Sequence, residues 1–422
     1  MVVIIGAGIT GLALAHYLAE HGIEHVVLEA EAVPGGAIRT VRDGVRVLEA
    51  GPQRTRATPE LDRLVAELGL EADRIEAPAG LPLLVYHQGT LHRVPLDPRQ
   101  ALRSTLFSWR GKLRLVTEPL TRGPRRHETV AAYLARKLGR EAYERLAGPL
   151  FGGLYASDPA DMLVRHALAG LLRELGVRRS LTRALRRRGR GGGAGRVLSF
   201  RQGMQSLTDA LHERHRERIR LGTRVRAIRA AGARLVVEDG RERLEASDVV
   251  LTTPADVSAA LLREVAPAAA DRLAQLRYNR VAIVHLLSGA RLEGSGYQVA
   301  FGERLETRGV TFNTNLFSRE GVYTAFLGGA RNPALADWPD FRIGAIAAAE
   351  FELVTGAEAR VLHVSRARLP AWDRSWTALE GLELPPGIHL AANYESRMGI
   401  PGRIARARQL AETLAAGGRA AG

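Results

Sequence analysis

The chain has 422 residues, more than a single hydrophobic core usually serves, and a hydrophobic fraction of 46% that is ordinary for a globular protein. It contains no cysteine, which excludes disulfides, thiolate–metal sites, catalytic thiols and cysteine-linked flavin. The formal net charge of +15 comes almost entirely from arginine. This charge suits anionic ligands, anionic lipid headgroups or nucleic acid, although a genome biased toward arginine explains it equally well.

The first elements of the chain predict a βαβ unit. Residues 2–5 are four β-branched residues in a row, which is typical of a buried parallel strand. A helical pattern covers residues 9–20 and ends before Gly22, and residues 26–28 form the next apolar run. A further helix is predicted over residues 60–70.

The middle of the chain has a different pattern. Between about residues 97 and 195, helical patterns rich in arginine and leucine alternate with glycine and proline, and strand signals are absent. Later stretches predict strands again and then a last amphipathic helix, at 219–240, 246–255, 278–330, 387–394 and, for the helix, 398–416. Strands of the nucleotide-binding type therefore occur at the start, in the middle and at the end. We expect one doubly wound domain with other domains inserted into it.

The sequence has no targeting or membrane-spanning signal. No run of about 18 apolar residues occurs, and a strand begins at Val2 without a basic leader. We therefore expect a cytoplasmic protein without a transmembrane helix. The arginine run at 183–190 has no recognisable nucleic-acid motif beside it, so nucleic acid is not an expected partner.

A glycine motif between the first strand and the first helix predicts a dinucleotide site. Gly6 permits a tight turn, Gly8 lets a pyrophosphate approach the backbone, and Gly11 lets the helix pack closely on the strand. The helix N-terminus, at Ile9 and Thr10, then faces the phosphates.

An acidic residue and a second glycine motif narrow the choice of dinucleotide. Glu29 ends the second strand, where its carboxylate can accept hydrogen bonds from a ribose diol and disfavours the extra phosphate of NADP. Gly35 and Gly36, followed by Arg39, resemble the second signature of the glutathione-reductase-type flavoproteins in their amine-oxidase-like branch. In that branch the arginine approaches the pyrophosphate, so the motif indicates FAD. For Arg39 alone, an ordinary surface arginine is the alternative.

Other segments resemble the flavin contacts of the same branch. Gly51 and Pro52 are similar to the stretch beside the flavin, and Val225 matches a valine whose backbone holds the adenine. At the start of the last helix, the backbone of Met398, Gly399 and Ile400 matches the flavin-pyrimidine contact. The positive end of that helix would stabilise the reduced, anionic flavin.

Three longer stretches resemble signatures of the FAD-dependent protoporphyrinogen and coproporphyrinogen oxidases, at 148–168, 198–211 and 390–414. The chain is identified as a member of this family over essentially its whole length. The resemblance implies an α/β fold: a doubly wound, Rossmann-like FAD-binding domain with an inserted antiparallel-sheet substrate domain and an inserted helical domain. The expected boundaries are 1–75, 196–260 and 385–422 for the FAD-binding domain, 76–96 and 261–384 for the substrate domain, and 97–195 for a membrane-associating helical insert.

The resemblance implies a function in haem biosynthesis. The implied reaction is the oxygen-dependent, six-electron oxidation of protoporphyrinogen IX to protoporphyrin IX, in which FAD accepts hydride and O2 reoxidises it to hydrogen peroxide. Oxidation of coproporphyrinogen III to coproporphyrin III is one alternative, and a catalytically silent flavin-fold binding protein is another. Amine oxidases use a late lysine near the flavin, whereas no lysine follows Lys137. Carotenoid desaturases would not explain the stretch at 148–168.

Arg99 falls where the family has an arginine that pairs with a substrate propionate, and an arginine fork suits a carboxylate. An exposed arginine without such a role is the alternative. No catalytic side chain and no metal ligand is assigned. The sequence departs from the family pattern at Trp372–Trp376 and at Gly402-Arg403, which puts the identity of the substrate in doubt more than the cofactor.

The expected partners are a porphyrinogen, O2 and a membrane surface. In the family the helical insert attaches to membranes, here the inner face of the cell membrane. Leu106, Phe107 and Trp109 beside basic residues suit an anionic surface, unless they form the core of the insert. A homodimer is left open.

Overall fold

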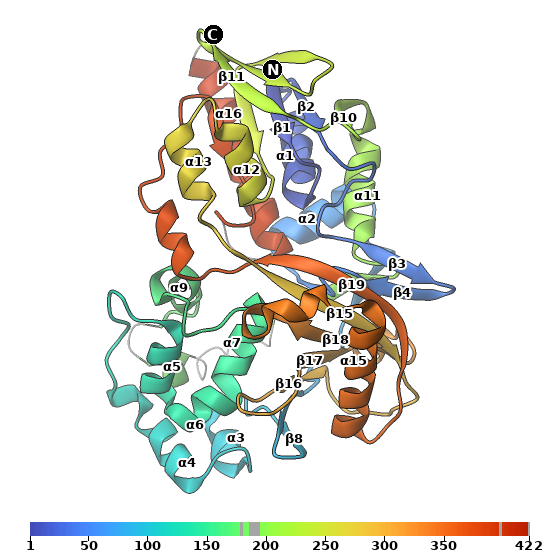
Figure 1. Cartoon of the computed structure of the whole chain (residues 1–422), viewed down its shortest axis with the longest axis vertical. Helices are drawn as coiled ribbons and strands as arrows, with labels where there is room; N and C mark the ends of the chain where they lie inside the picture. Colours follow the sequence, from blue (N-terminus) through green and yellow to red (C-terminus); the bar gives the residue numbers. More distant parts are fainter. Residues whose placement is uncertain (178–179, 185–194, 396–398, 421–422) are drawn as a thin grey trace.

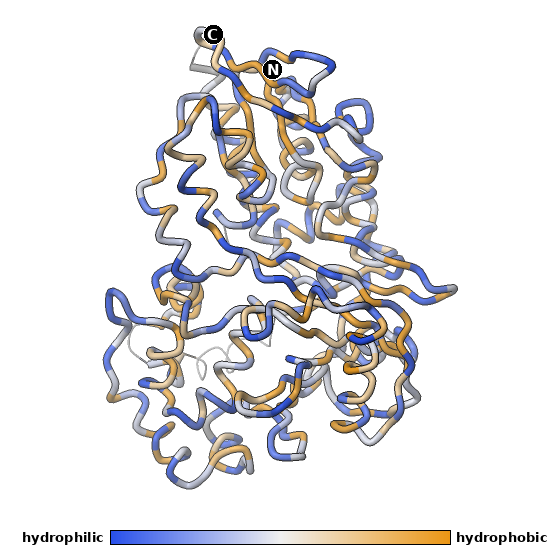
Figure 2. The backbone as a smooth tube through the Cα atoms, in the orientation of Figure 1, coloured by the Kyte–Doolittle hydropathy of each residue, from blue (hydrophilic) through white to orange (hydrophobic). Residues whose placement is uncertain are grey.

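The computed structural model describes residues 1–177, 180–184, 195–395 and 399–420. In Figure 1 the upper part of the molecule contains both termini and a parallel sheet, and the lower part contains a larger sheet beside a group of helices. Figure 2 shows hydrophobic stretches along the buried strands and hydrophilic stretches along the loops and the outer helices. None of the described helices is long and apolar enough to cross a lipid bilayer.

The upper sheet has five parallel strands drawn from distant parts of the chain (Figure 1). Their order is β10 (Ile219–Arg220), β2 (His25–Leu28), β1 (Val2–Ile5), β14 (Asp248–Leu251) and β20 (Ile388–Leu390). Successive residues of β1 point to opposite faces of this sheet. Ile4 packs against the helices on one face, and Val3 packs against the elements on the other face. Both faces are covered, which is why these strands are continuous apolar runs. The predicted βαβ start is confirmed.

Helices cover one face of this sheet and a mixed layer covers the other. The first face carries α1 (Ile9–Glu20), α2 (Pro59–Glu67), α11 (Gln205–Arg214) and α16 (Ile400–Ala420). The second face carries α12 (Ala255–Leu262), α13 (Pro267–Leu273) and an antiparallel sheet of β11 (Ala227–Ala231), β12 (Arg234–Glu238) and β13 (Arg243–Ala246). The predicted last helix is confirmed, with Ile404, Ala407 and Leu410 on its buried face.

The lower sheet has seven strands and is antiparallel except between β16 and β7. Its order is β19 (Arg360–Pro370), β15 (Tyr278–Leu287), β18 (Val322–Gly328), β17 (Thr307–Phe312), β16 (Gly296–Val299), β7 (Leu83–His87) and β8 (Thr90–Arg93). The helix α15 (Asp340–Thr355) packs on it, and α14 (Asn313–Phe317) connects β17 to β18. Between the two large sheets lie the hairpin β3 (Thr40–Asp43) and β4 (Arg46–Glu49), and a small sheet of β5 (Thr55–Arg56), β9 (Val197–Phe200) and β6 (Arg74–Glu76).

The third part is helical, as the sequence predicts for residues 97–195, and its described residues form no strand beyond one isolated bridge. It contains α3 (Pro98–Arg103), α4 (Trp109–Val116), α5 (Val130–Leu138), α6 (Arg140–Ala142), α7 (Gly148–Tyr155), α8 (Val164–Ala167) and α9 (Ala169–Glu174). Leu106 and Phe107 are buried in its core, whereas Trp109 is exposed. The structure therefore divides the three apolar residues that the sequence grouped together.

Candidate functional site

The glycine motif forms a tight turn at the carboxyl end of β1. Gly6 has φ +108°, and a Cβ placed on it would lie 2.6 Å from Thr252 Oγ1. A Cβ on Gly11 would lie 2.0 Å from the Gly6 carbonyl oxygen, so α1 packs directly on the turn. At Gly8 a Cβ would have no atom within 4 Å. Open space at the second glycine, beside the helix N-terminus at Ile9 and Thr10, fits a dinucleotide pyrophosphate.

Glu29 lies beside this turn, at the end of β2. Its carboxylate accepts hydrogen bonds from the Ala7 N–H at 2.7 Å and from the Glu31 N–H at 2.9 Å. The Glu29 carbonyl accepts from the Thr223 N–H at 2.7 Å, which brings the segment leading to the buried Val225 alongside. A carboxylate oriented by backbone donors fits the ribose diol of a dinucleotide.

The second glycine motif packs against the first. Gly36 has φ +59°, and a Cβ on it would lie 3.2 Å from Gly8 Cα. The Gly35 N–H donates to the Ala7 carbonyl at 2.8 Å. The half-buried Arg39 folds over its own loop and donates from Nη1 to the Pro34 carbonyl at 2.6 Å. The two motifs therefore form one surface, although they are far apart in the sequence.

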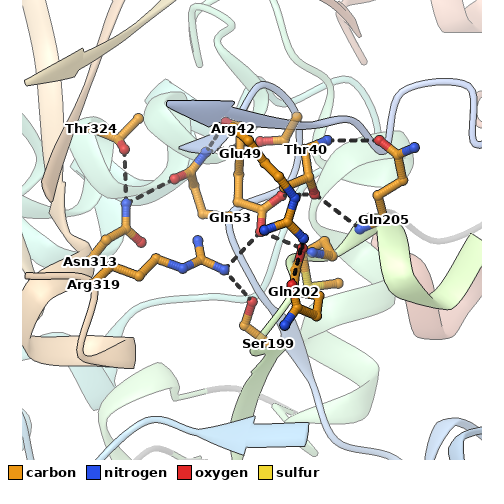
Figure 3. A network of polar contacts seen from close by, with 12 residues as sticks. Thr40, Arg42, Glu49, Gln53, Ser199, Gln202, Gln205, Asn313, Arg319 and Thr324 are labelled. Carbon is orange, nitrogen blue, oxygen red and sulfur yellow. Dashed lines mark hydrogen bonds and ion pairs between the residues drawn. The ribbon is translucent and has the colours of Figure 1, made fainter. Parts of the chain in front are cut away.

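The turn at Gly51 and Pro52 is held from both sides. A Cβ on Gly51 would lie 2.0 Å from the Ala37 carbonyl oxygen, so this turn touches the second glycine motif. The buried Gln53 donates from Nε2 to the Glu49 carbonyl at 2.7 Å and accepts at Oε1 from Asn313 Nδ2 at 3.0 Å. Asn313 is the first residue of α14 and also donates from Nδ2 to Thr324 Oγ1 of β18 at 2.8 Å (Figure 3). The Gly51-Pro52 turn, which is expected beside the flavin, is thus fixed through Asn313 to the seven-stranded lower sheet.

A buried ion pair between Glu49 and Arg319 also joins this region to the segment after α14 (Figure 3). Glu49 Oε1 lies 2.8 Å from Arg319 Nη2 and also accepts from the Met204 N–H at 2.9 Å. Glu49 Oε2 accepts from Thr40 Oγ1 at 2.8 Å. Burial raises the pKa of the Glu49 carboxyl, and the Arg319 charge and the hydrogen bonds oppose that shift. The sequence contains no signal for Arg319 as the partner of Glu49, or for Asn313 as the partner of Gln53.

The start of α16 closes the site near the carboxyl ends of the strands. Gly399 has φ +91°, and the Arg403 N–H donates to the Gly399 carbonyl at 3.3 Å. The Arg403 guanidinium is buried and donates to the carbonyls of Ala392 and, at 2.7 Å, of Asn393. Burial lowers the pKa of Arg403 to about 10, so this side chain remains cationic at neutral pH. Met398, the first residue of the predicted flavin contact, lies outside the described residues.

The departure at Trp372–Trp376 also has a structural account. The two rings stack with centroids 5.3 Å apart, and Trp376 Nε1 donates to the Tyr394 carbonyl at 3.0 Å. Trp372 has φ +53°, in the region that favours glycine, which is costly for a bulky side chain. Trp376 therefore holds the segment between β20 and α16, and Trp372 stacks against Trp376.

Arg99 and Arg54 lie in different parts of the fold. Arg99 is exposed on α3, at the lower end of the molecule in Figure 1, and the structure does not bring it together with the glycine motifs. Arg54 comes two residues after Pro52 and is also exposed.

Comparison with known proteins agrees with this geometry. The family model of the flavin-containing amine oxidoreductases matches residues 9–397. Chloroplastic protoporphyrinogen oxidase from Oryza sativa subsp. japonica is 30% identical over 376 residues, which cover 79% of this chain and 70% of the relative. Protoporphyrinogen oxidase from Bos taurus is 31% identical over 358 residues, with coverages of 76% and 74%. Coproporphyrinogen III oxidase from Mycobacterium leprae (strain TN) is 29% identical over 336 residues, with coverages of 75% and 74%.

Solved structures share the fold over nearly the whole chain. A crystal structure from Exiguobacterium sp. 255-15, provisionally described as a protoporphyrinogen oxidase, is 25% identical with a TM-score of 0.81, and the match covers 98% of both chains. Cyclohexylamine oxidase from Brevibacterium oxydans IH-35A has a TM-score of 0.72 at 16% identity, covering 98% of this chain and 99% of that one. The predicted fold class and the predicted cofactor, FAD, are confirmed. The chain therefore belongs to the flavin-containing amine oxidoreductases, in the branch of the FAD-dependent protoporphyrinogen oxidases, and is an FAD-dependent oxidoreductase.

Proposed function

We propose that the protein oxidises a porphyrinogen to the porphyrin in haem biosynthesis, with protoporphyrinogen IX as substrate. The reaction removes six electrons and six hydrogens in three two-electron steps, and three O2 molecules are reduced to three H2O2. The observation that carries the proposal is the similarity to the rice and bovine protoporphyrinogen oxidases, which extends over three quarters of the chain.

The residues of the chain supply binding and orientation rather than acid–base chemistry. FAD, when bound, supplies hydride acceptance and the reduction of O2. Gly8 and Glu29 offer the pyrophosphate and ribose contacts. The Gly51-Pro52 turn is held rigid by Gln53, which keeps one wall of the site fixed between the two large sheets. Such positioning lowers the entropic cost of bringing a large macrocycle into a reactive arrangement.

Coproporphyrinogen III is the second candidate substrate. The relative from Mycobacterium leprae is named for it, and this molecule has two propionates where protoporphyrinogen IX has two vinyl groups. The arginine-rich composition is compatible with the more acidic substrate. Oxidation rates on both porphyrinogens, measured side by side by porphyrin fluorescence, test the proposal. A higher kcat/KM on coproporphyrinogen III would replace the first candidate by the second.

A catalytically silent flavin protein is the remaining alternative, suggested by the departures at Trp372–Trp376 and Gly402-Arg403. Both departures pack into the fold around the segment between β20 and α16. Peroxide release with each porphyrinogen separates the two possibilities. A purified protein that contains FAD but releases no peroxide with either substrate would support the silent alternative, and a protein that binds no FAD would refute both.

For its location we propose the inner face of the cell membrane, with α4 as the contact. Trp109, Leu113 and Val116 are exposed on this helix, and Leu120 is exposed just after it. The sequence of α4 contains three basic residues and no acidic one. An exposed apolar stripe with basic neighbours suits an anionic lipid surface. Co-sedimentation with vesicles of anionic and of neutral lipid, for wild type and Trp109→Gln/Leu113→Gln, tests this contact, since equal sedimentation of the two proteins would contradict it.

A further inference from the structure

The helices α1 and α2, in the upper part of the molecule, bring one histidine and two glutamates together (Figure 1). His16 and Glu20 lie one turn apart on α1, and Glu67 is the last residue of α2. His16 Nε2 lies 3.0 Å from Glu67 Oε2 and 3.7 Å from Glu20 Oε1, and one donor atom of each side chain lies within 4.8 Å of the others. Ligand atoms at about 2.0–2.2 Å from a tetrahedral Zn²⁺ ion are roughly 3.3 Å apart, so small side-chain adjustments place all three on one ion.

The three side chains differ in their access to solvent. His16 is 2% exposed, whereas the side chains of Glu67 and Glu20 are 28% and 50% exposed. The histidine is therefore fixed inside the protein, and the two carboxylates lie between it and the solvent. An ion can reach this group from the solvent and keep a water molecule as its fourth ligand.

The second ring nitrogen of His16 has a partner of its own. His16 Nδ1 lies 3.1 Å from Nε2 of His215, the residue that ends α11, and the two rings meet edge to face. A histidine that binds a metal normally uses its other nitrogen in a hydrogen bond that fixes the orientation of the ring. His16 is thus held with Nε2 directed toward the two carboxylates.

The charges around the two carboxylates favour a cation. Glu20 and Glu67 are the last residues of their helices, where the helix dipole is negative, and neither helix has a basic residue in its last turn. In the described parts of the chain, no lysine or arginine forms an ion pair with either carboxylate. Arg214 contacts Glu67, but it donates to the backbone carbonyl at 2.9 Å. The pair of carboxylates therefore lacks a permanently charged partner.

We propose that His16, Glu20 and Glu67 bind a Zn²⁺ ion that ties α1 to α2. The imidazole ligand favours a transition-metal ion over Mg²⁺ and Ca²⁺, which prefer oxygen ligands. Glu20 lies about 18 Å along α1 from Gly8, so the ion is remote from the expected pyrophosphate. The ion stabilises the packing of the two helices and takes no part in oxidation, and this inference does not depend on the identity of the substrate.

The test is Zn²⁺ binding to the full-length, FAD-loaded protein, prepared without a histidine tag and stripped of metal with a chelator. Isothermal titration calorimetry compares wild type, Glu20→Gln, Glu67→Gln and the matched control Glu71→Gln, which changes an exposed carboxylate just after α2. We expect one Zn²⁺ site in wild type, at least about tenfold weaker in Glu20→Gln and in Glu67→Gln and unchanged in Glu71→Gln. Mg²⁺ is expected to bind at least about 100-fold more weakly than Zn²⁺.

Thermal unfolding of the same proteins supplies a second measurement. Zn²⁺ should raise the melting temperature of wild type and of Glu71→Gln, but not that of the double variant Glu20→Gln/Glu67→Gln. The melting temperatures without metal show whether the variants are folded. Zn²⁺ affinity in the double variant equal to that of wild type would place the ion elsewhere and overturn the proposal.

Wild-type crystals soaked in zinc chloride give a test that needs no variant. An anomalous difference peak between His16, Glu20 and Glu67 would support the proposal, and zinc peaks at other residues alone would overturn it. A wild type that binds no Zn²⁺ in solution would also overturn it, and would leave His16 and Glu67 as a hydrogen-bonded pair.

Discussion

Glu49 and Arg319 form a buried ion pair, with 2.8 Å between Oε1 and Nη2, that joins the hairpin strand β4 to the loop after α14. Removing one partner leaves the other charge buried, which costs about 3–5 kcal/mol. We expect Arg319→Met to lower the free energy of unfolding by that amount in urea denaturation. Glu49→Gln/Arg319→Met removes both charges and is expected to be more stable than Arg319→Met, giving a favourable coupling energy. Additive losses in the double variant would show that the pair is not coupled.

The glycine turn allows a matched pair of substitutions. A Cβ on Gly8 meets no atom within 4 Å, whereas a Cβ on Gly11 would lie 2.0 Å from the Gly6 carbonyl oxygen. Gly8→Ala should leave the thermal stability of the FAD-free protein nearly unchanged but reduce FAD affinity about tenfold or more, because the methyl group occupies the space next to the phosphates. Gly11→Ala should lower the stability of the FAD-free protein itself. Scanning calorimetry and FAD fluorescence measure the two effects, and equal losses of stability would contradict the assignment.

Because His285 is buried, we expect the free energy of unfolding to decrease in mild acid. His285 has no exposed surface, and its Nε2 lies 3.1 Å from the Glu49 carbonyl oxygen. Burial and then the charge of His363 lower the pKa of His285 to about 4, while an unfolded histidine titrates near about 6.5. The unfolded state therefore takes up a proton first as the pH falls. Stability from this group is complete above about pH 6.5 and is lost progressively down to about pH 4, by roughly 3 kcal/mol.

Unfolding measured from pH 7.5 to pH 4 checks this expectation. His285→Gln retains a donor for the Glu49 carbonyl and has no titration, so its stability should fall less steeply over that range. His215, whose pKa burial also lowers to about 4, accounts for part of the slope that remains. Identical slopes for the two proteins would mean that His285 does not contribute.

Arg99 remains a testable prediction. If it pairs with a substrate propionate, Arg99→Ala raises KM and leaves flavin reduction at saturating substrate nearly unchanged. Its exposed place on α3 offers no buried contact to support that role. Stopped-flow reduction of the bound flavin by porphyrinogen over a range of concentrations separates the two constants. An unaltered apparent affinity would remove Arg99 from the site.

The sequence predicts local features of this protein better than its long-range contacts. The run Val2–Ile5, the helix after Gly8 and the carboxylate of Glu29 are neighbours in the chain, so periodicity and spacing reveal them. The contacts that fix the Gly51-Pro52 turn are not local, since Glu49 and Arg319 are separated by 270 positions and Gln53 and Asn313 by 260. No spacing rule relates such residues before the two sheets are assembled.

The structural role of residues that depart from the family pattern, such as Gly402-Arg403, cannot be predicted from the sequence. Gly402-Arg403 indicated only that something differs, because a buried arginine is recognised by the carbonyls around it and not by its neighbours in sequence.

The order of strands in the parallel sheet has a consequence for biosynthesis. The central strand β1 pairs with β14, and Ile5 receives a hydrogen bond from Thr252, 247 positions later. The edge strand β20 and the covering helix α16 come later still. During translation, β1, α1 and β2 are therefore synthesised well before β14, β20 and α16. One apolar face of this first unit stays uncovered until the last segment has been translated. The parallel sheet that carries the dinucleotide turn can therefore be completed only after β20 and α16 have been synthesised.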